Sequence, residues 1–265
     1  MIKNYTDASL QAGDEIDFVE KYWTNKWQTV GINSDAYFQH AYEELQKQEE
    51  LKITENYLLP LPKGAKILDG GCGLGLWTLY FSSKGYETHG LDISKSSVEI
   101  LNKRFPQNHF SVGDIRKTNF SNAFFDAYFS WGTFEHFENG LGPCFEEAQR
   151  LLKPSATLLI SVPFANTRHA KSLRKLTSKP PQLAQRFYQW RLSEQELQVE
   201  FERHGFEFLA YYYTSKMNGI ERYLHHEWNV DSQKLLGKII KRVLYYLLPA
   251  SYISHMIIGV GRKRT

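Results

Sequence analysis

Residues 67–78 read ILDGGCGLGLWT, and this stretch carries most of the fold information in the 265-residue chain. Lys66–Asp69 is a short apolar segment of the kind that forms a buried strand, and residues 76–84 have a helical pattern. Glycines separate the two segments at alternate positions, Gly71, Gly73 and Gly75. Such glycines let the backbone turn sharply and approach a ligand, and the start of the helix offers free N–H groups. The stretch therefore predicts a loop that holds a nucleoside-containing cofactor.

The alternation of strand and helix continues along the chain outward from this stretch. Such alternation predicts an α/β fold with a mostly parallel sheet covered by helices on both faces. Right-handed crossovers leave few topologies for a sheet of this kind. The predicted strands are 66–69, 87–92, 109–114, 125–131, 157–163, 207–213 and 256–260. The predicted helices that follow or separate them are 76–84, 94–105, 142–152, 193–205 and 232–248.

The first 60 residues have a different pattern and are predicted to be helical. Residues 14–28 place apolar side chains three and four positions apart, which indicates one buried helix face. A second helix is predicted from about residue 35 to Leu59, after which two prolines end it. We therefore expect an N-terminal helical cap over residues 1–60 and a cofactor-binding domain over residues 61–265.

The spacing of the glycines separates two classes of cofactor. The fingerprint of nicotinamide-dependent dehydrogenases needs Gly-x-Gly-x-x-Gly, but the third position holds Leu76 when counted from Gly71 and Thr78 when counted from Gly73. Asp69 at the end of the first strand is also foreign to that fingerprint, and it suits a ligand with an ammonium group. A dehydrogenase is therefore the disfavoured alternative.

The same residues resemble the first motif of class I S-adenosylmethionine (SAM)-dependent methyltransferases, Asp/Glu-x-Gly-x-Gly-x-Gly, and the chain resembles small-molecule members of the ubiquinone-biosynthesis type (type 11–12 group). The resemblance implies a Rossmann-like three-layer sandwich with a seven-stranded sheet, strand order 3-2-1-4-5-7-6 and the last strand antiparallel. It also implies SAM as cofactor, with Asp92 on the ribose hydroxyls, Asp114 on the adenine amino group and Ile115 against the ring. The implied cofactor-binding residues are Asp69, Gly71, Cys72, Gly73, Gly75, Asp92, Ile93, Asp114, Ile115, Ser130 and Trp131.

Residues 130–137 read SWGTFEHF and follow the fourth predicted strand, where ligands bind in an open parallel sheet. They resemble the Glu-His element of small-molecule methyltransferases, which makes Glu135 and His136 the candidate catalytic residues. His136 would take the proton of an acceptor hydroxyl, since an imidazole titrates near working pH. The alternative is that it only holds the loop by hydrogen bonding. Some relatives hold a divalent metal with this pair and an acid three residues earlier, where this chain has Gly132, so no metal is predicted.

Aromatic side chains are a further set of candidate ligand contacts. Aromatic faces can hold a sulfonium by cation–π attraction. Trp131 and Phe134 are candidates by position, and Tyr22 and Trp23 on the first helix stay open. Trp27 is assigned to the core, because aromatic residues at helical spacing usually pack there.

Positive charge is concentrated in two stretches of the chain. Residues 166–191 and 233–265 carry 14 of the 32 cationic residues and no acid. We expect the first to be a substrate-cover insert that suits a phosphate- or carboxylate-bearing acceptor, a solvated surface being the alternative. The predicted helix 233–248 is amphipathic and basic, so it either lies on an anionic membrane or docks against the sheet.

These observations favour SAM-dependent methyl transfer to a hydroxyl of a small molecule or glycan, with a non-catalytic SAM-binding protein as the alternative. The chain lacks the Asn/Asp-Pro-Pro-aromatic element of enzymes that methylate nucleic-acid amino groups, so no nucleic-acid partner is expected. Cys72 and Cys144 cannot build a disulfide framework, and no signal-like or membrane-spanning apolar run is visible. The expected location is the cytoplasm, and the oligomeric state stays open.

Overall fold

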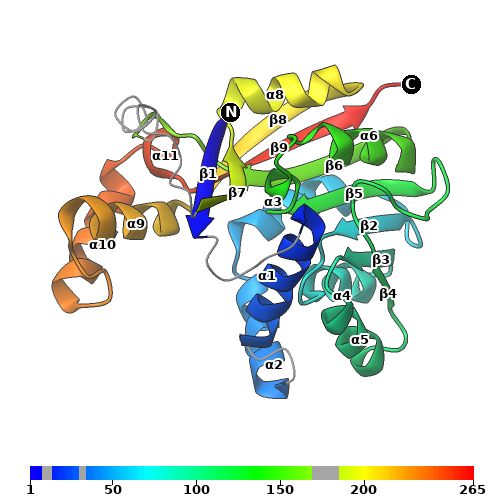
Figure 1. The fold of residues 1–265 in the computed structure, drawn as a ribbon, viewed down its shortest axis with the longest axis horizontal. Helices are drawn as coiled ribbons and strands as arrows, with labels where there is room; N and C mark the ends of the chain where they lie inside the picture. The colour runs from blue at the N-terminus through cyan, green and yellow to red at the C-terminus, as the bar shows by residue number, and fades with distance from the viewer. Residues whose placement is uncertain (8–13, 30–33, 169–184) are drawn as a thin grey trace.

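The computed structural model describes residues 1–7, 14–29, 34–168 and 185–265. Within these ranges a seven-stranded sheet has the order β4-β3-β2-β5-β6-β9-β8 (Figure 1). Neighbouring strands from β4 to β6 are parallel, and β9 is antiparallel to β6 and β8. The predicted fold and strand order are therefore confirmed. Along the sheet the strands are β4 (His109–Val112), β3 (Glu87–Asp92), β2 (Lys66–Gly70), β5 (Phe125–Trp131), β6 (Leu152–Pro163), β9 (Met256–Lys263) and β8 (Phe206–Thr214).

Helices cover both faces of the sheet, as predicted. Successive residues of a strand point to opposite faces, so Leu68 and Tyr128 belong to one core and Ile67 and Phe129 to the other. This alternation lets each central strand contribute to both layers of packing. On the first face lie α6 (Gly142–Leu151) and α8 (Glu194–Arg203), and on the other lie α3 (Glu49–Leu58), α4 (Leu76–Ser83) and α5 (Lys95–Arg104) (Figure 1).

The N-terminal region contains a strand that the sequence pattern does not predict. β1 (Ile2–Asp7) pairs antiparallel with β7 (Gln185–Arg191), far along the chain, in a separate two-stranded sheet. The prediction of helices alone in the first 60 residues is therefore wrong at this point. The segment IKNYTD has no clear apolar period, and it is stabilised by a partner strand that only the fold brings near.

The rest of the N-terminal region is helical, with one more break than predicted. α1 (Glu15–Thr29) matches the predicted first helix. The predicted second helix is two helices, α2 (Asp35–Leu45) and α3, with Ser34 capping α2 by accepting a hydrogen bond from the Tyr37 N–H. No glycine or proline stands between α2 and α3, so the composition does not reveal the break.

Three helices connect β8 to β9, and the sequence pattern predicts one of them. They are α9 (Lys216–Trp228), α10 (Leu235–Leu247) and α11 (Ala250–Ile253). Gly219 on α9 lies against α11, where a Cβ atom would be 1.8 Å from the Ile253 carbonyl oxygen. α10 is the predicted basic helix, but its inner side packs on α9 and α11 rather than on the sheet. The described part of the chain contains no helix long and apolar enough to cross a bilayer.

Candidate active site

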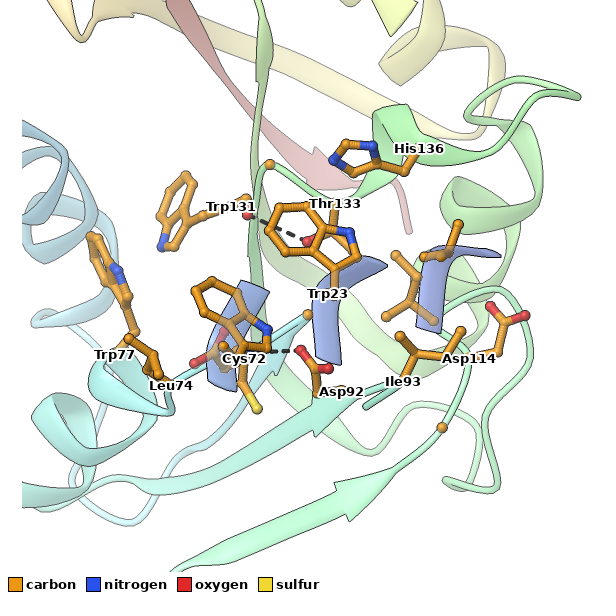
Figure 2. Close-up of a pocket in the computed structure, with 18 of the residues that line it drawn as sticks. Trp23, Cys72, Leu74, Trp77, Asp92, Ile93, Asp114, Trp131, Thr133 and His136 are labelled. Atoms are coloured by element: carbon orange, nitrogen blue, oxygen red, sulfur yellow. Dashed lines mark hydrogen bonds between the residues drawn. The ribbon is translucent and has the colours of Figure 1, made fainter. Parts of the chain in front are cut away.

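A cavity of about 240 Å³ lies at the carboxyl ends of β2, β3 and β5, beneath side chains of α1 (Figure 2). This is the edge at which parallel α/β sheets bind ligands. Most of the predicted site residues line this one cavity, although they come from distant segments of the chain. They are Asp69, Gly71, Cys72, Gly73, Asp92, Ile93, Asp114, Ile115, Trp131 and His136.

The glycine loop forms one wall of the cavity and has no room for larger residues. Gly71 and Gly73 have φ angles of 78° and 52°, in the left-handed region. A Cβ atom on Gly71 would lie 2.2 Å from the Thr133 hydroxyl oxygen, and one on Gly73 would lie 2.6 Å from a ring carbon of Trp27. Gly75 has a different place: it is the N-cap of α4 and does not line the cavity.

Asp69 lies near the carboxyl end of β2 with 2% of its surface exposed. Its Oδ2 accepts hydrogen bonds from the Thr78 N–H (3.1 Å) and the Thr78 hydroxyl (2.7 Å). Burial raises the pKa of the Asp69 carboxyl to about 7, against the opposing effect of these two bonds. Burial disfavours the ionised carboxyl because water is excluded around it. For the same reason, a cation that enters the cavity beside Asp69 interacts strongly with the ionised carboxylate and favours that form.

Asp92 ends β3 and is held in one orientation by backbone groups. Its Oδ2 accepts a hydrogen bond from the Gly73 N–H (2.8 Å), and its Oδ1 accepts one from the Ser94 N–H (2.9 Å). Burial raises the pKa of the Asp92 carboxyl, and the backbone N–H groups oppose that rise. A carboxylate has about four lone-pair positions. Asp92 therefore retains acceptor capacity for the two hydroxyl groups of a ribose.

Asp114 and Ile93 line the cavity (Figure 2), and Ile115 lines it as well. Its carboxylate forms an ion pair with Arg116, whose Nη2 lies 2.8 Å from Oδ2. The other guanidinium nitrogen, Nη1, lies 2.7 Å from a carboxylate oxygen of Glu15 on α1. The family resemblance assigns Asp114 to an adenine amino group, and this ion pair is not predicted from the sequence. In the structure the Asp114–Arg116–Glu15 chain connects the loop after β4 to α1.

Indole side chains form the apolar part of the cavity. Trp23 and Trp27 of α1 stack with centroids 5.4 Å apart, and Trp77 of α4 and Trp131 of β5 have centroids 5.1 Å apart. The Nε1 atoms of Trp27 and Trp131 are buried without a hydrogen-bond partner. Since unpaired buried donors cost free energy, these two N–H groups fit acceptor atoms of a bound ligand. Trp27 packs against the apolar cluster that includes Phe38 and Leu74, as its assignment to the core predicts, and it also lines the cavity. Phe134 is buried away from the cavity lining.

His136 lines the cavity with its ring against the indole of Trp23 (Figure 2). Its Nδ1 donates a hydrogen bond to the Tyr188 carbonyl oxygen (2.7 Å), and the Tyr188 hydroxyl accepts one from Tyr22. Burial lowers the pKa of the His136 imidazole to about 4, although contacts with the carbonyls of Tyr188 and Gly132 oppose this. The expectation of an imidazole that titrates near working pH is therefore wrong, because the surrounding elements bury the ring. At neutral pH the ring is uncharged, and Nε2 is its acceptor atom.

Glu135 and Ser130 lie behind the cavity wall rather than in it. The Glu135 Oε1 is 4.0 Å from the His136 Nε2, and its Oε2 is buried without a hydrogen-bond partner. Burial raises the pKa of the Glu135 carboxyl to about 8, so the carboxyl is mostly protonated at neutral pH. The Ser130 hydroxyl donates to the Gly70 carbonyl oxygen (2.6 Å) and ties β5 to the glycine loop. Both residues are placed to position the loops that carry His136 and Gly71.

Much of the predicted substrate cover lies outside the described residues. That part includes Lys171, Arg174, Lys175 and Lys179. The described cations of the stretch contact protein groups: Arg168 pairs with Glu227, and Arg186 and Arg191 donate hydrogen bonds to backbone carbonyls. None of these three lines the cavity.

A group of metal-donor atoms lies on β3 and β4, apart from the cavity lining. Glu87, His89 and His109 each place one donor atom within 4.8 Å of the others. In the cavity itself, position 132 is glycine, so the Glu135-His136 pair has no third donor there. No metal is assigned to either place.

Several cavity residues are absent from the set identified in the sequence. Thr133 and Phe137 flank the predicted His136, and Leu74, Leu76 and Trp77 lie in or just after the glycine loop, so sequence position is a usable signal for these five. Gly113 likewise directly precedes the predicted Asp114, whereas Val19 carries no such signal. Val19 reaches the cavity because α1 folds over it, which only the tertiary structure shows.

Comparison with known proteins agrees with this geometry. A family model described as a methyltransferase domain matches residues 38–211. Phosphoethanolamine N-methyltransferase of Plasmodium falciparum (isolate 3D7) is 33% identical over 118 residues, which are 42% of this chain and 44% of that protein. Malonyl-[acyl-carrier protein] O-methyltransferase of Erwinia billingiae (strain Eb661) is 28% identical over 145 residues, 55% of this chain and 56% of that protein. The chain spans about half the length of these curated relatives.

Among solved structures, phosphoethanolamine N-methyltransferase 2 of Haemonchus contortus, in complex with SAM, superposes with a TM-score of 0.62 at 16% identity. The match covers 96% of this chain and 61% of that one, and at this identity it shows the fold alone. The family model spans well over half of the chain and includes the glycine loop, Asp92 and Asp114. The resemblance in the sequence is thereby confirmed, and the chain belongs to the methyltransferase-domain family of class I SAM-dependent enzymes.

Proposed function

We propose that this chain binds SAM in the cavity and transfers its methyl group to a hydroxyl of a small molecule or glycan. The observation that carries the proposal is the lining of one cavity. Asp69, Asp92 and Asp114 stand at the ends of three neighbouring strands, and the uncharged His136 lies in the same cavity. Family membership supports the cofactor, and no nucleic acid is proposed as partner.

The cavity offers a complementary group for each part of SAM. Asp69 faces the ammonium group, and Asp92 accepts hydrogen bonds from the ribose hydroxyls with the lone pairs that Gly73 and Ser94 leave free. Ile115 packs against the adenine ring. The orphan N–H groups of the cavity indoles, Trp27 and Trp131, suit the carboxylate of the ligand.

When bound, SAM supplies an activated methyl group on a sulfonium. The protein then needs mainly to align the acceptor oxygen with that methyl, since positioning supplies most of the acceleration. The indoles of Trp23 and Trp131 provide π-faces for the positive charge. As the C–O bond forms and the C–S bond breaks, the acceptor proton becomes strongly acidic. His136 takes it at Nε2, for which even a weakly basic imidazole suffices.

The relatives leave the acceptor atom undecided, because one is named an N-methyltransferase and the other an O-methyltransferase. A hydroxyl is favoured here by His136, since an oxygen must lose its proton during transfer whereas a neutral amine attacks without prior help. The described cations of residues 166–191 contact protein groups, so they do not by themselves argue for an anionic acceptor.

Two measurements test the proposal. Calorimetric titration of the full chain should show binding of SAM and S-adenosylhomocysteine and none of NAD. Asp92→Ala should weaken SAM binding by about 10- to 100-fold, because two hydrogen bonds to a carboxylate are lost. Binding of NAD without SAM would overturn the methyltransferase reading and favour the dehydrogenase.

A product-mass screen with isotopically labelled SAM then tests turnover on panels of phenols, sugars, glycans and amines. Label in a hydroxyl-bearing product is the expected result, and label only in amines would correct the acceptor atom. SAM binding with no labelled product on any panel would favour a non-catalytic SAM-binding protein.

A further inference from the structure

The outer side of α10 leaves six large apolar side chains in solvent, at the end of the molecule away from β4 (Figure 1). At about 100° per residue, these six fall within an arc of about 120° on the helix. Their exposed fractions are 77% for Leu235, 67% for Leu236, 54% for Ile239, 49% for Val243, 75% for Tyr246 and 70% for Leu247. We call this arc the α10 face.

The buried side of the same helix accounts for its attachment to the protein. Ile240 and Leu244 pack with Ile220, Leu224 and Ile253 of α9 and α11. α10 is therefore anchored through one face and needs none of the six exposed residues for that packing. A soluble protein rarely exposes so many contiguous large apolar side chains without a partner.

The charged residues that α10 itself carries are all positive. Lys238 and Arg242 are exposed along one flank of the arc, and Lys234 precedes the first turn. Lys241, further round, pairs with Glu221 of α9 at 2.5 Å. The sequence from 232 to 265 contains no Asp or Glu, so no acid of this segment neutralises the flank.

We propose that the α10 face docks on an anionic phospholipid membrane surface, with the six apolar side chains in the interfacial region and the cations at the lipid phosphates. An apolar arc flanked by Lys and Arg is typical of helices that lie in the membrane interface. Tyr246 fits this location as well, because tyrosine is enriched at the level of the lipid headgroups. A second copy of this chain fits less well, because a two-fold contact of this face would bring its cations together. The proposal does not rest on the proposed methyl transfer.

The position of the helix relates this face to the cavity. α9 starts after Thr214, the end of β8, and α11 is followed by Met256, the start of β9. Thr214 and Pro163, the end of β6, both pair with Met256. The helices therefore emerge from the sheet edge at which the parallel strands end and the cavity lies.

Sedimentation with lipid vesicles tests the proposal on the full chain. Wild type should bind vesicles of phosphatidylcholine and phosphatidylglycerol, and bind phosphatidylcholine alone much more weakly. The double variant Leu236→Ser/Val243→Ser should bind the anionic vesicles at least about tenfold more weakly, because two apolar side chains no longer enter the interface. Val199→Ser is the matched control, since Val199 is 45% exposed but lies on α8.

A second pair of substitutions isolates the charge. Lys238→Gln/Arg242→Gln should lower binding to anionic vesicles about fivefold for each charge removed and should leave binding to neutral vesicles unchanged. SAM titration should be the same in all these variants, which separates failure of this proposal from failure of the proposed function. No wild-type binding to anionic vesicles would overturn the proposal. So would a dimer in light scattering that Leu236→Ser/Val243→Ser converts to monomer, since the face would then be an interface between copies.

Discussion

Replacement of Asp69 by Asn tests the electrostatics of the cavity most directly. The Asp69 carboxyl is buried, and burial raises its pKa from 3.8 to about 7. At about 1.4 kcal/mol for each pKa unit, keeping this group ionised costs the folded protein about 4 kcal/mol. Asn preserves the size of the side chain and an oxygen for Thr78, and it removes the charge. The substitution should therefore stabilise the unliganded protein and weaken its hold on a cationic ligand.

The sign and the pH range of the effect follow from the two pKa values. In the unfolded chain the Asp69 carboxyl ionises near pH 4, and in the folded chain near pH 7. Between these values the folded protein binds more protons, so its free energy of unfolding falls as the pH rises. The Asn variant has no such proton. We expect it to exceed wild type in stability by up to about 4 kcal/mol at about pH 8 and by almost nothing at about pH 4, in urea denaturation of both proteins.

SAM binding should show the converse dependence on pH. Only ionised Asp69 pairs with the ammonium group, so wild-type affinity should rise about tenfold per pH unit from about pH 5 to about pH 7 and then level off. Asp69→Asn should bind weakly and without that slope in calorimetric titration. A stability difference between the two proteins that does not change between about pH 4 and pH 8 would refute the reasoning, because Asp69 would then be ionised throughout.

Three further predictions concern two residues of the cavity wall and one residue behind it. His136→Ala should lower turnover by about 10²- to 10⁴-fold and leave SAM affinity nearly unchanged. The wild-type rate should fall with acid only as the pH approaches 4, where the imidazole gains its proton, so a loss of rate near pH 6.5 would contradict this. Gly73→Ala should abolish SAM binding in titrations, because the new Cβ atom meets the ring of Trp27. The control Gly64→Ala is also at positive φ but in open space, so it should cost only about 1 kcal/mol of stability and leave SAM binding intact. Glu135→Gln should change the free energy of unfolding little near pH 4 and raise it above that of wild type by an amount that grows with pH up to about 8, because the unfolded carboxyl ionises from its ordinary pKa of 4.5 and the folded one only near about 8. Thermal melts near pH 4 and pH 8 would show a less stable variant at pH 8 if the carboxylate were a needed charge.

Much of the fold can be predicted from the chain alone because its signals are local. The apolar segment at Lys66–Asp69, the alternate glycines and the helix from Leu76 specify a strand, a turn and a helix without reference to distant residues. Parallel strands place their carboxyl ends at one edge, so the acids at 69, 92 and 114 are expected together before any contact is known. The elements that the sequence does not predict are those with weak local signals. β1 needs β7 to exist as a strand, and α9 buries little besides Ile220 and Leu224.

The chemistry of the site depends on elements that arrive from elsewhere in the chain. Sequence position alone determined that His136 follows the fourth strand, but α1 and β7 bury its ring and lower its pKa to about 4. In the same way, Trp27 becomes a cavity residue only because α1 folds over Gly73, and Glu15 of α1 joins the local pair of Asp114 and Arg116 only in the folded chain. The sequence by itself determined the sheet and which residues end its strands, because backbone pattern is encoded locally. Only the tertiary structure decided their charge states, their partners and the apolar face left open on α10, because burial and electrostatic contact depend on residues far apart in the chain.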